Sequence, residues 1–251
     1  MPYRLIALAL CLIATAAVAA DCPGNPAGLG TARVLDIDYT TYPRIGRRHF
    51  PVTLPLQPKE LVLTFDDGPW PATTPRVLEA LKHECVRATF FLLGRNAAAF
   101  PALARRELAE GHTVAHHTYS HPLLSRMALP RAIAEIDRGI AAVEAALYGA
   151  ARPKPTTPFF RFPGFASNPA LLDELQRRGL VVFGADLWAS DWNRMTPATE
   201  LRLVLNRLTQ AGGIVLFHDT QPATAAMLPA FLRELKRRDF RVVHVVAPPP
   251  R

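Results

Sequence analysis

Short apolar runs alternate with helical periodicity from residue 60 onward. Seven runs have the length of buried strands, and they cover residues 61–65, 88–93, 113–117, 159–162, 180–185, 213–217 and 241–246. Between the runs, hydrophobic residues recur every three or four positions, most clearly at Ile133, Ile136, Ile140, Val143 and Leu147. Strands that alternate with helices in this way predict an α/β fold built on a parallel sheet.

Polar residues near the ends of these runs distinguish an open sheet from a barrel. Five different strands each carry one at the carboxyl end, and these are Asp66, His117, Arg161, Asp186 and His218. An open sheet would spread such positions along an edge, whereas a barrel gathers them at one mouth. The pattern therefore predicts an incomplete TIM-type (β/α)7 barrel.

The first 59 residues do not share this regular pattern. Residues 21–59 show no sustained period and contain prolines throughout, which predicts a proline-rich arm wrapped on the domain of residues 60–251. In residues 1–20, Arg4 precedes an apolar run that ends in small residues, as in a secretory signal peptide. The run is shorter than the ~20 residues that span a bilayer. We therefore expect a secreted or periplasmic protein with no stable membrane anchor after cleavage.

Removal of a signal peptide would leave two cysteines, Cys22 and Cys85. An even number of cysteines in an oxidising compartment is typical of disulfide pairing. We expect one disulfide, which would tie the arm to the domain.

Composition and charge narrow the class of protein. The chain has 251 residues, of which 49% are hydrophobic, and this suits one large domain with a sizeable core. The formal net charge is +8, and many of the cations lie near expected helix ends, where they complement the helix dipole. A mild attraction to an anionic cell-surface polymer remains open. Nucleic acid is not an expected partner, because no basic stripe is interleaved with aromatic residues.

Two adjacent carboxylates, Asp66 and Asp67, follow the apolar run of residues 61–65. Carboxylates side by side at the end of a buried strand repel each other unless a cation or a proton relieves them. Their position indicates a metal site or acid/base chemistry, and the residues alone do not distinguish the two aspartates.

Histidines after the third run supply further ligands. Adjacent side chains on a strand point to opposite faces, so His116 and His117 cannot both face the mouth. If Thr113 and Ala115 line the interior, His117 points the same way, and a turn could return His121 to the same metal. Two imidazoles and one carboxylate suit Zn²⁺ or a similar divalent ion such as Co²⁺ or Ni²⁺, with open positions for water and substrate.

Five segments along residues 60–246 resemble, in order, the motifs of the polysaccharide deacetylase (NodB-homology) family, carbohydrate esterase family 4. They are Thr64-Phe65-Asp66-Asp67-Gly68-Pro69, His117-Thr118-Tyr119-Ser120-His121, Arg161-Phe162-Pro163-Gly164-Phe165, Asp191-Trp192 and Leu216-Phe217-His218-Asp219. The resemblance implies that Asp67, His117 and His121 hold the metal and that Asp66 is the general base. It also implies that Arg161 orients Asp66 and that His218 is the general acid.

Two positions depart from the family pattern. An aromatic residue usually follows the proline of the third motif, and its backbone amide helps to hold the oxyanion; Gly164 stands there and keeps the amide. The leading aspartate of the fourth motif is replaced by Trp188. Either Asp186 or Asp191 could then tune His218, and Asp186 is preferred.

Trp70, Trp188 and Trp192 all follow strand ends and could stack on sugar faces. The resemblance and the residues together predict a metal-dependent enzyme that removes N-acetyl groups from N-acetylglucosamine residues of peptidoglycan or of chitin-type oligomers. An O-acetyl polysaccharide esterase and a non-catalytic sugar-binding protein are alternatives. A two-metal phosphoesterase is disfavoured, because only one full ligand set is visible.

Overall fold

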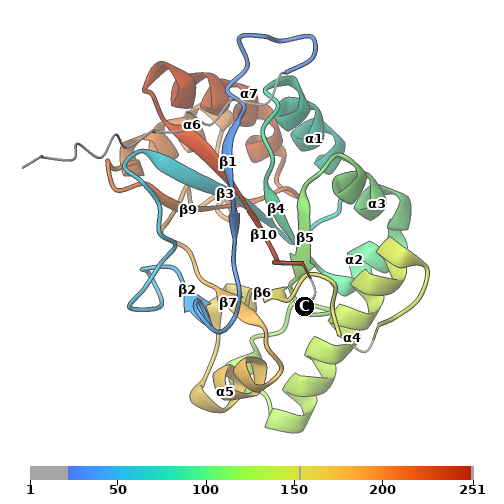
Figure 1. The fold of residues 1–251 in the computed structure, drawn as a ribbon. Helices are drawn as coiled ribbons and strands as arrows, with labels where there is room; N and C mark the ends of the chain where they lie inside the picture. The colour runs from blue at the N-terminus through green and yellow to red at the C-terminus, as the bar shows by residue number, and fades with distance from the viewer. Residues whose placement is uncertain (1–21, 153, 250–251) are drawn as a thin grey trace, which may run out of the picture.

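A computed structural model describes residues 22–152 and 154–249 (Figure 1). The predicted signal peptide of residues 1–20 lies outside the described residues. Within the described part of the chain, no helix is both long enough and apolar enough to cross a membrane.

A ladder of parallel strands forms the barrel. It runs in the order β2-β7-β6-β5-β4-β3-β9-β8. The strands, in chain order, are β2 (Arg44–Ile45), β3 (Glu60–Asp66), β4 (Thr89–Leu92), β5 (Thr113–His116), β6 (Phe159–Phe160), β7 (Val181–Phe183), β8 (Leu187–Trp188) and β9 (Gly213–His218). Among the described residues no strand pairing joins β8 to β2 or β7, so the predicted barrel is present and is open along one seam.

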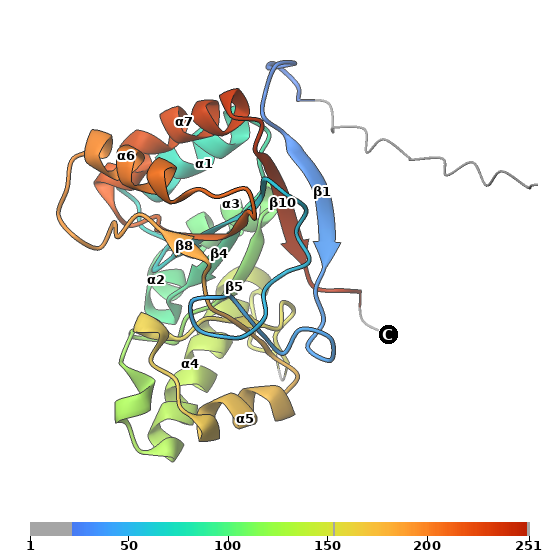
Figure 2. The ribbon, with the colours of Figure 1, turned by 90° about the vertical axis from the view of Figure 1, so that its left-hand side faces the viewer.

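Helices cover the outside of the barrel (Figures 1 and 2). They are α1 (Thr74–His83), α2 (Gly94–Ala99), α3 (Pro101–Ala109), α4 (Leu129–Tyr148), α5 (Pro169–Arg177), α6 (Pro197–Arg207) and α7 (Pro222–Arg237), with short 3₁₀ turns at Leu124–Arg126 and Pro163–Phe165. The side chains of Asn168 and Thr196 cap α5 and α6 by accepting a backbone N–H of the first turn.

The last predicted strand has a different place from the one expected. β10 (Arg241–Val246) pairs with β3 over only two residues, and most of its length pairs in parallel with β1 (Thr31–Asp36) of the arm. The carbonyl of Val245 accepts the hydroxyl of Thr113 at the start of β5, at 2.6 Å. β1 and β10 therefore lie side by side across the amino ends of the barrel strands (Figure 2).

Alternation along the strands separates two hydrophobic layers. Val62, Phe91, Ala115 and Ile214 face the interior, where Val243 and Val245 of β10 join them. The intervening residues of β3, including Leu61, Leu63 and Phe65, pack outward with α1 and α7. A separate outer cluster contains Ile136 and Ile140 of the helical face expected in α4. Burial of both faces explains why these strands read as continuous apolar runs.

The N-terminal arm is attached to the domain at several points. The predicted disulfide joins Cys22 to Cys85, with 5.5 Å between the Cα atoms. β2 adds to the edge of the barrel at β7, and β1 adds to β10. The arm is therefore part of the sheet, which its irregular sequence did not indicate.

Candidate active site

Three side chains meet at the mouth of the barrel in an arrangement suited to one cation. Oδ1 of Asp67 lies 3.5 Å from Nε2 of His117 and 3.4 Å from Nε2 of His121. The three ligand atoms all lie within 4.8 Å of one another. Oδ1 of Asp67 is buried and has no hydrogen-bond partner among the described residues, as expected of an atom that would face a cation.

The two histidines reach this point by different routes. Thr113, Ala115 and His117 point inward together, as the strand alternation predicted, and Nδ1 of His117 lies 2.8 Å from the carbonyl oxygen of Arg161. Because a carbonyl oxygen can only accept, Nδ1 carries the ring hydrogen, and the lone pair of Nε2 is free to bind a cation. Burial lowers the pKa of His117, the carboxylates of Asp66 and Asp67 partly offset the effect, and the imidazole stays neutral as ligation requires.

The turn after β5 returns His121 to the mouth. Thr118 and His121 both have φ of 68°, and the backbone N–H of His121 donates to the hydroxyl of Thr118 at 3.1 Å. Asp67 also has a positive φ, 77°, so two of the three ligands lie in a backbone region that non-glycine residues rarely adopt. α4 packs against this turn at Gly139, where any side chain would overlap the backbone of Thr118.

Asp66 lies beside this group and is held by a buried arginine. Nη1 of Arg161 donates to Oδ1 of Asp66 at 2.7 Å and to the hydroxyl of Thr64 at 2.9 Å. Its Nη2 donates to the carbonyl of Gly184, and its guanidinium lies over the ring of Phe91. Arg161 is fully buried, so its hydrogen bonds leave the guanidinium a single orientation. The other oxygen of Asp66 lies 3.8 Å from Nε2 of His117.

His218 is the register partner of Asp66 on the neighbouring strand, so both reach the mouth together. Its Nδ1 lies 2.9 Å from Oδ1 of Asp191, and its backbone N–H donates to Oδ2 of Asp191 at 2.6 Å. Burial alone would lower the pKa of His218. The hydrogen bond and charge of Asp191, with the charges of Asp67 and Asp66, outweigh that effect and raise the pKa to about 9.

The preference for Asp186 as the partner of His218 is wrong. The carboxylate of Asp186 accepts the backbone N–H of Arg47 at 2.6 Å, the hydroxyl of Thr53 at 2.7 Å and the backbone N–H of Ile214 at 2.8 Å. Asp186 therefore links the arm to β9 across the open seam of the barrel. Asp191, in the loop after β8, takes the place beside His218.

A buried carboxyl and a hydroxyl behind Asp191 were not identified from the sequence. The hydroxyl of Thr224 lies 3.0 Å from Oδ2 of Asp191 and 2.8 Å from Oε1 of Glu200. Burial raises the pKa of Glu200 to about 7. A protonated Glu200 can donate to Thr224, whose single hydrogen then goes to Asp191. Neither residue lies in a recognisable motif, and their positions on α6 and α7 gave no signal.

Asp219 lies against the loop that carries Asp67, the candidate metal ligand. Its carboxylate accepts the hydroxyl of Thr74, which in turn accepts the backbone N–H of Trp70 at 2.7 Å. A side chain at Gly68 would overlap this carboxylate. The fifth motif is therefore packed directly against the first, and Gly68 allows the close approach.

Aromatic side chains surround the mouth. Trp70 and Trp192 are 43% and 49% exposed, and the Trp192 ring lies edge-on to His218. Trp188 is partly covered and stacks on Phe165. Gly164 adopts a positive φ of 55°, and Leu123 lies beside it. The ring of Phe165, one residue later, stacks on His49 and on Trp188.

The residues at the mouth fit a divalent cation. One carboxylate and two imidazoles form a donor set typical of a catalytic zinc-type site, with positions left for water and substrate. The fold and the site together define an α/β-barrel protein that has, within its described residues, one candidate cation site, with two titratable groups, Asp66 and His218, beside it.

Comparison with known proteins places the chain in a family. The polysaccharide deacetylase family model matches residues 54–183. The chain is 34% identical to the peptidoglycan-N-acetylglucosamine deacetylase PgdA of Listeria monocytogenes over 80% of its own length, and it spans 42% of that protein. It is 37% identical to the chitooligosaccharide deacetylase of a Bradyrhizobium strain, covering 73% of the chain and 88% of that enzyme.

Solved structures agree with this placement. The Bdellovibrio bacteriovorus peptidoglycan deacetylase Bd3279 superposes with a TM-score of 0.76 at 31% identity, covering 87% of the chain and 59% of that structure. The chain belongs to the polysaccharide deacetylase family.

Proposed function

We propose that the protein is a metal-dependent N-deacetylase that releases acetate from N-acetylglucosamine residues of peptidoglycan or of chitin-type oligomers. The observation that supports this most strongly is the convergence of Asp67, His117 and His121 on one point, with Asp66 and His218 on adjacent strands beside it. The names of the relatives point to the same two substrates.

Zn²⁺ is the cation we expect at this site, with Co²⁺ or Ni²⁺ able to replace it, because imidazole nitrogens suit all three. A bound divalent cation would polarise the acetyl carbonyl and lower the pKa of a water molecule toward ~7. The remaining steps belong to side chains of this chain.

Asp66 accepts the proton of the attacking water. Its Oδ1 is occupied by Arg161 and its Oδ2 faces the ligand His117, so Oδ2 is the oxygen available to the proton. Arg161 holds the carboxylate in this orientation and stabilises its negative charge. The backbone amide of Gly164 is the donor that we assign to the developing oxyanion.

His218 donates a proton to the nitrogen of the leaving amine. Asp191 keeps the imidazole protonated at neutral pH, which is the state that a general acid needs. Amine expulsion requires this proton more strongly than expulsion of an alcohol does. The raised pKa of His218 therefore favours an N-deacetylase over an O-acetyl esterase.

Export from the cytoplasm fits these assignments. The disulfide between Cys22 and Cys85 is typical of an oxidising compartment, and a cell-wall polymer lies outside the membrane. We therefore assign a secreted or periplasmic location, with cleavage of residues 1–20.

The test measures acetate released from peptidoglycan, N-acetylated chitooligosaccharides and O-acetylated xylan, with and without a chelator. Release from an N-acetylated substrate that stops with chelator and returns with Zn²⁺ is the expected result. Release only from O-acetylated xylan would assign an esterase. Glycan binding without acetate release from any substrate would assign a non-catalytic sugar-binding protein.

A variant separates the acid from the metal ligands. His218→Ala should lower turnover by about 100-fold or more, as loss of a general acid does, while bound metal stays at the level of the unaltered protein. Loss of metal from His218→Ala would show that His218 is a ligand.

A further inference from the structure

A strip of aromatic rings connects the proposed general acid to the N-terminal arm. The ring of Trp192 lies 6.0 Å from that of His218, and the ring of Trp188 lies 5.9 Å from that of Trp192. The guanidinium of Arg48 lies over Trp188, 5.0 Å from the ring centroid. A ligand group that contacts Arg48 therefore belongs to a sugar unit beyond the one that reacts.

The arm holds Arg48 in this place. The backbone N–H of Arg48 donates to the carbonyl of Ala185 at 3.0 Å, and its Nε donates to the carbonyl of Asp186 at 3.4 Å. The ring of the next residue, His49, stacks on Phe165 at 3.7 Å. Backbone and neighbouring contacts thus orient the guanidinium before any ligand arrives, which lowers the entropy lost on binding.

The charge of Arg48 is not neutralised within the described part of the chain, where it forms no ion pair. The carboxylate of Asp186, whose backbone carbonyl accepts from Arg48, is buried and pairs with Arg47 at 3.3 Å. Burial, with the charges of Arg161 and Arg48, lowers the pKa of His49 to about 4, so His49 adds no positive charge at neutral pH. One exposed cation therefore stands at the end of the aromatic strip.

We propose that Arg48 binds a carboxylate of the polymer and so makes the enzyme favour acidic glycans of the peptidoglycan type over neutral chitin-type chains. The proposal rests on the deacetylase function above and names the substrate class of that site. A guanidinium presents paired donors that match the two oxygens of a carboxylate. In peptidoglycan that carboxylate belongs either to the stem peptide or, where the peptide has been removed, to the lactyl group.

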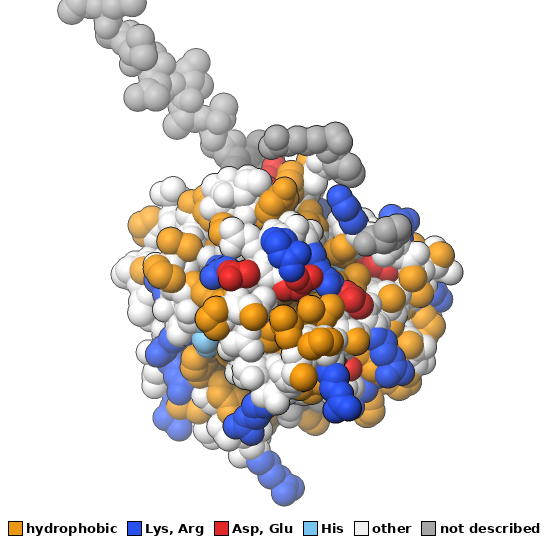
Figure 3. All heavy atoms as spheres, turned by 90° about the horizontal axis from the view of Figure 1, so that it is seen from below, with side chains coloured by type: hydrophobic (Ala, Val, Ile, Leu, Met, Phe, Trp, Pro, Cys, Tyr) orange, Lys and Arg blue, Asp and Glu red, His pale blue; other side chains and the backbone are white. Residues whose placement is uncertain are grey.

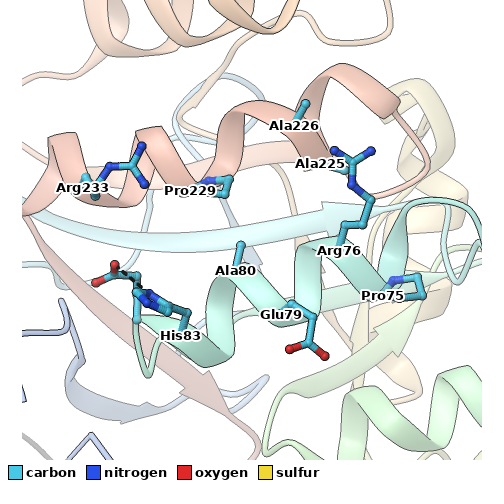
Figure 4. Close-up of a pocket in the computed structure, with 10 residues that line it drawn as sticks. Pro75, Arg76, Glu79, Ala80, His83, Ala225, Ala226, Pro229 and Arg233 are labelled. Carbon is cyan, nitrogen blue, oxygen red and sulfur yellow. Dashed lines mark hydrogen bonds and ion pairs between the residues drawn. The ribbon is translucent and has the colours of Figure 1, made fainter. Parts of the chain in front are cut away.

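Other surface arginines provide a matched control. A groove of about 520 Å³ lies between α1 and α7 on the outside of the barrel, and Arg76 and Arg233 border it (Figure 4). Elsewhere, Lys and Arg side chains are interspersed with acidic and hydrophobic ones on the face seen from below (Figure 3). Arg233→Gln removes the same charge as Arg48→Gln at a site away from the mouth.

The experiment compares four substrates: intact peptidoglycan, the same polymer with its carboxylates converted to methylamides, amidase-stripped glycan strands and N-acetylated chitohexaose. For each, kcat and KM are measured by acetate release for the unaltered enzyme and for Arg48→Gln, Arg48→Lys and Arg233→Gln.

For each enzyme, kcat/KM for intact polymer is divided by kcat/KM for methylamidated polymer. Arg48→Gln should lower this ratio by about fivefold, through a higher KM for the intact polymer. A fivefold change is the size expected for one partly exposed ion pair. Arg48→Lys should keep much of the ratio, Arg233→Gln should keep all of it, and 0.5 M salt should reduce the ratio of the unaltered enzyme. If Arg48→Gln affects intact polymer and amidase-stripped strands equally, either carboxylate can bind Arg48. If it affects only one of these substrates, the carboxylate of that substrate is the one that Arg48 binds.

An unchanged ratio in Arg48→Gln, or an equal loss in Arg233→Gln, would overturn the proposal. If the unaltered enzyme releases no acetate from any substrate, the deacetylase assignment fails. Dissociation constants for soluble acidic and methylamidated fragments then test the role of Arg48 separately. If Arg48→Gln binds only the acidic fragment more weakly than the unaltered protein does, the role of Arg48 is supported. If Arg48→Gln binds both fragments as tightly as the unaltered protein does, the role is refuted.

Discussion

Replacement of Asp191 by Asn should move the alkaline limit of activity to lower pH. In the structure Asp191 is fully buried and makes two hydrogen bonds to His218, one to the ring and one to the backbone. The rise of the pKa of His218 from 6.5 to about 9 corresponds to about 3 kcal/mol in favour of the imidazolium. Asn keeps the shape of the side chain and removes its charge.

The sign of the effect follows from the raised pKa. His218 is protonated, and able to act as an acid, below its pKa in the folded protein, and activity falls as pH rises through that value. A divalent cation beside Asp67 offsets part of the negative field, so the alkaline limit of the metal-loaded enzyme lies below 9. Loss of one charged hydrogen bond, ~1.5–3 kcal/mol, should lower the limit by about one to two pH units.

The assay is the pH profile of kcat/KM for chitohexaose, measured from pH 5 to 10 at constant ionic strength. Thr224→Val is the matched control, since it removes one hydrogen bond to Asp191 and keeps the charge. We expect a clear shift for Asp191→Asn and a small one for Thr224→Val. An alkaline limit in Asp191→Asn equal to that of the unaltered enzyme would refute the coupling of Asp191 to His218.

Three other substitutions test structural assignments. Asp186→Ala should lower the free energy of unfolding by about 3 kcal/mol, measured by urea denaturation, because three donors lose a buried acceptor; a change below 1 kcal/mol would contradict its role in linking the arm to β9. Cys85→Ser should lower the free energy of unfolding by about 4 kcal/mol in the same measurement, since the disulfide to Cys22 closes a loop across 63 positions. A variant as stable as the unaltered protein would show that the disulfide does not contribute to stability. Gly68→Ala should reduce both bound metal and turnover, because the added methyl overlaps Asp219 and displaces the neighbouring Asp67; full metal occupancy would show that the turn can adjust.

The sequence predicted the parts of the fold that repeat. Buried parallel strands are apolar on both faces, so β3, β4, β5 and β9 appear as runs that local composition reveals. Alternation along β5 correctly placed His117 inside and His116 outside, because strand geometry leaves no other choice. The disulfide was predicted from the two cysteines that remain after signal-peptide cleavage and from the oxidising compartment that such cleavage implies.

The parts that depend on tertiary contacts were not predictable. β1 and β2 are stabilised by pairing with β10 and β7, so the arm sequence carries no period of its own. Asp186 directly follows the predicted strand of residues 180–185, and Asp191 lies five residues further on, so the sequence favoured Asp186. In the folded protein the arm fills the open seam beside Asp186 and takes up its carboxylate. Asp191 is therefore the carboxylate that contacts His218.

The stoichiometry and affinity of Zn²⁺ binding test the central claim most directly. Calorimetric titration of the metal-free protein and of Asp67→Ala, with Asp66→Asn as the matched control, compares the proposed ligand with its neighbour. We expect one site per chain in the unaltered protein, a closely similar site in Asp66→Asn, and loss of the site in Asp67→Ala. Retention of full-affinity binding by Asp67→Ala would contradict the assignment of Asp67, His117 and His121 as the metal centre.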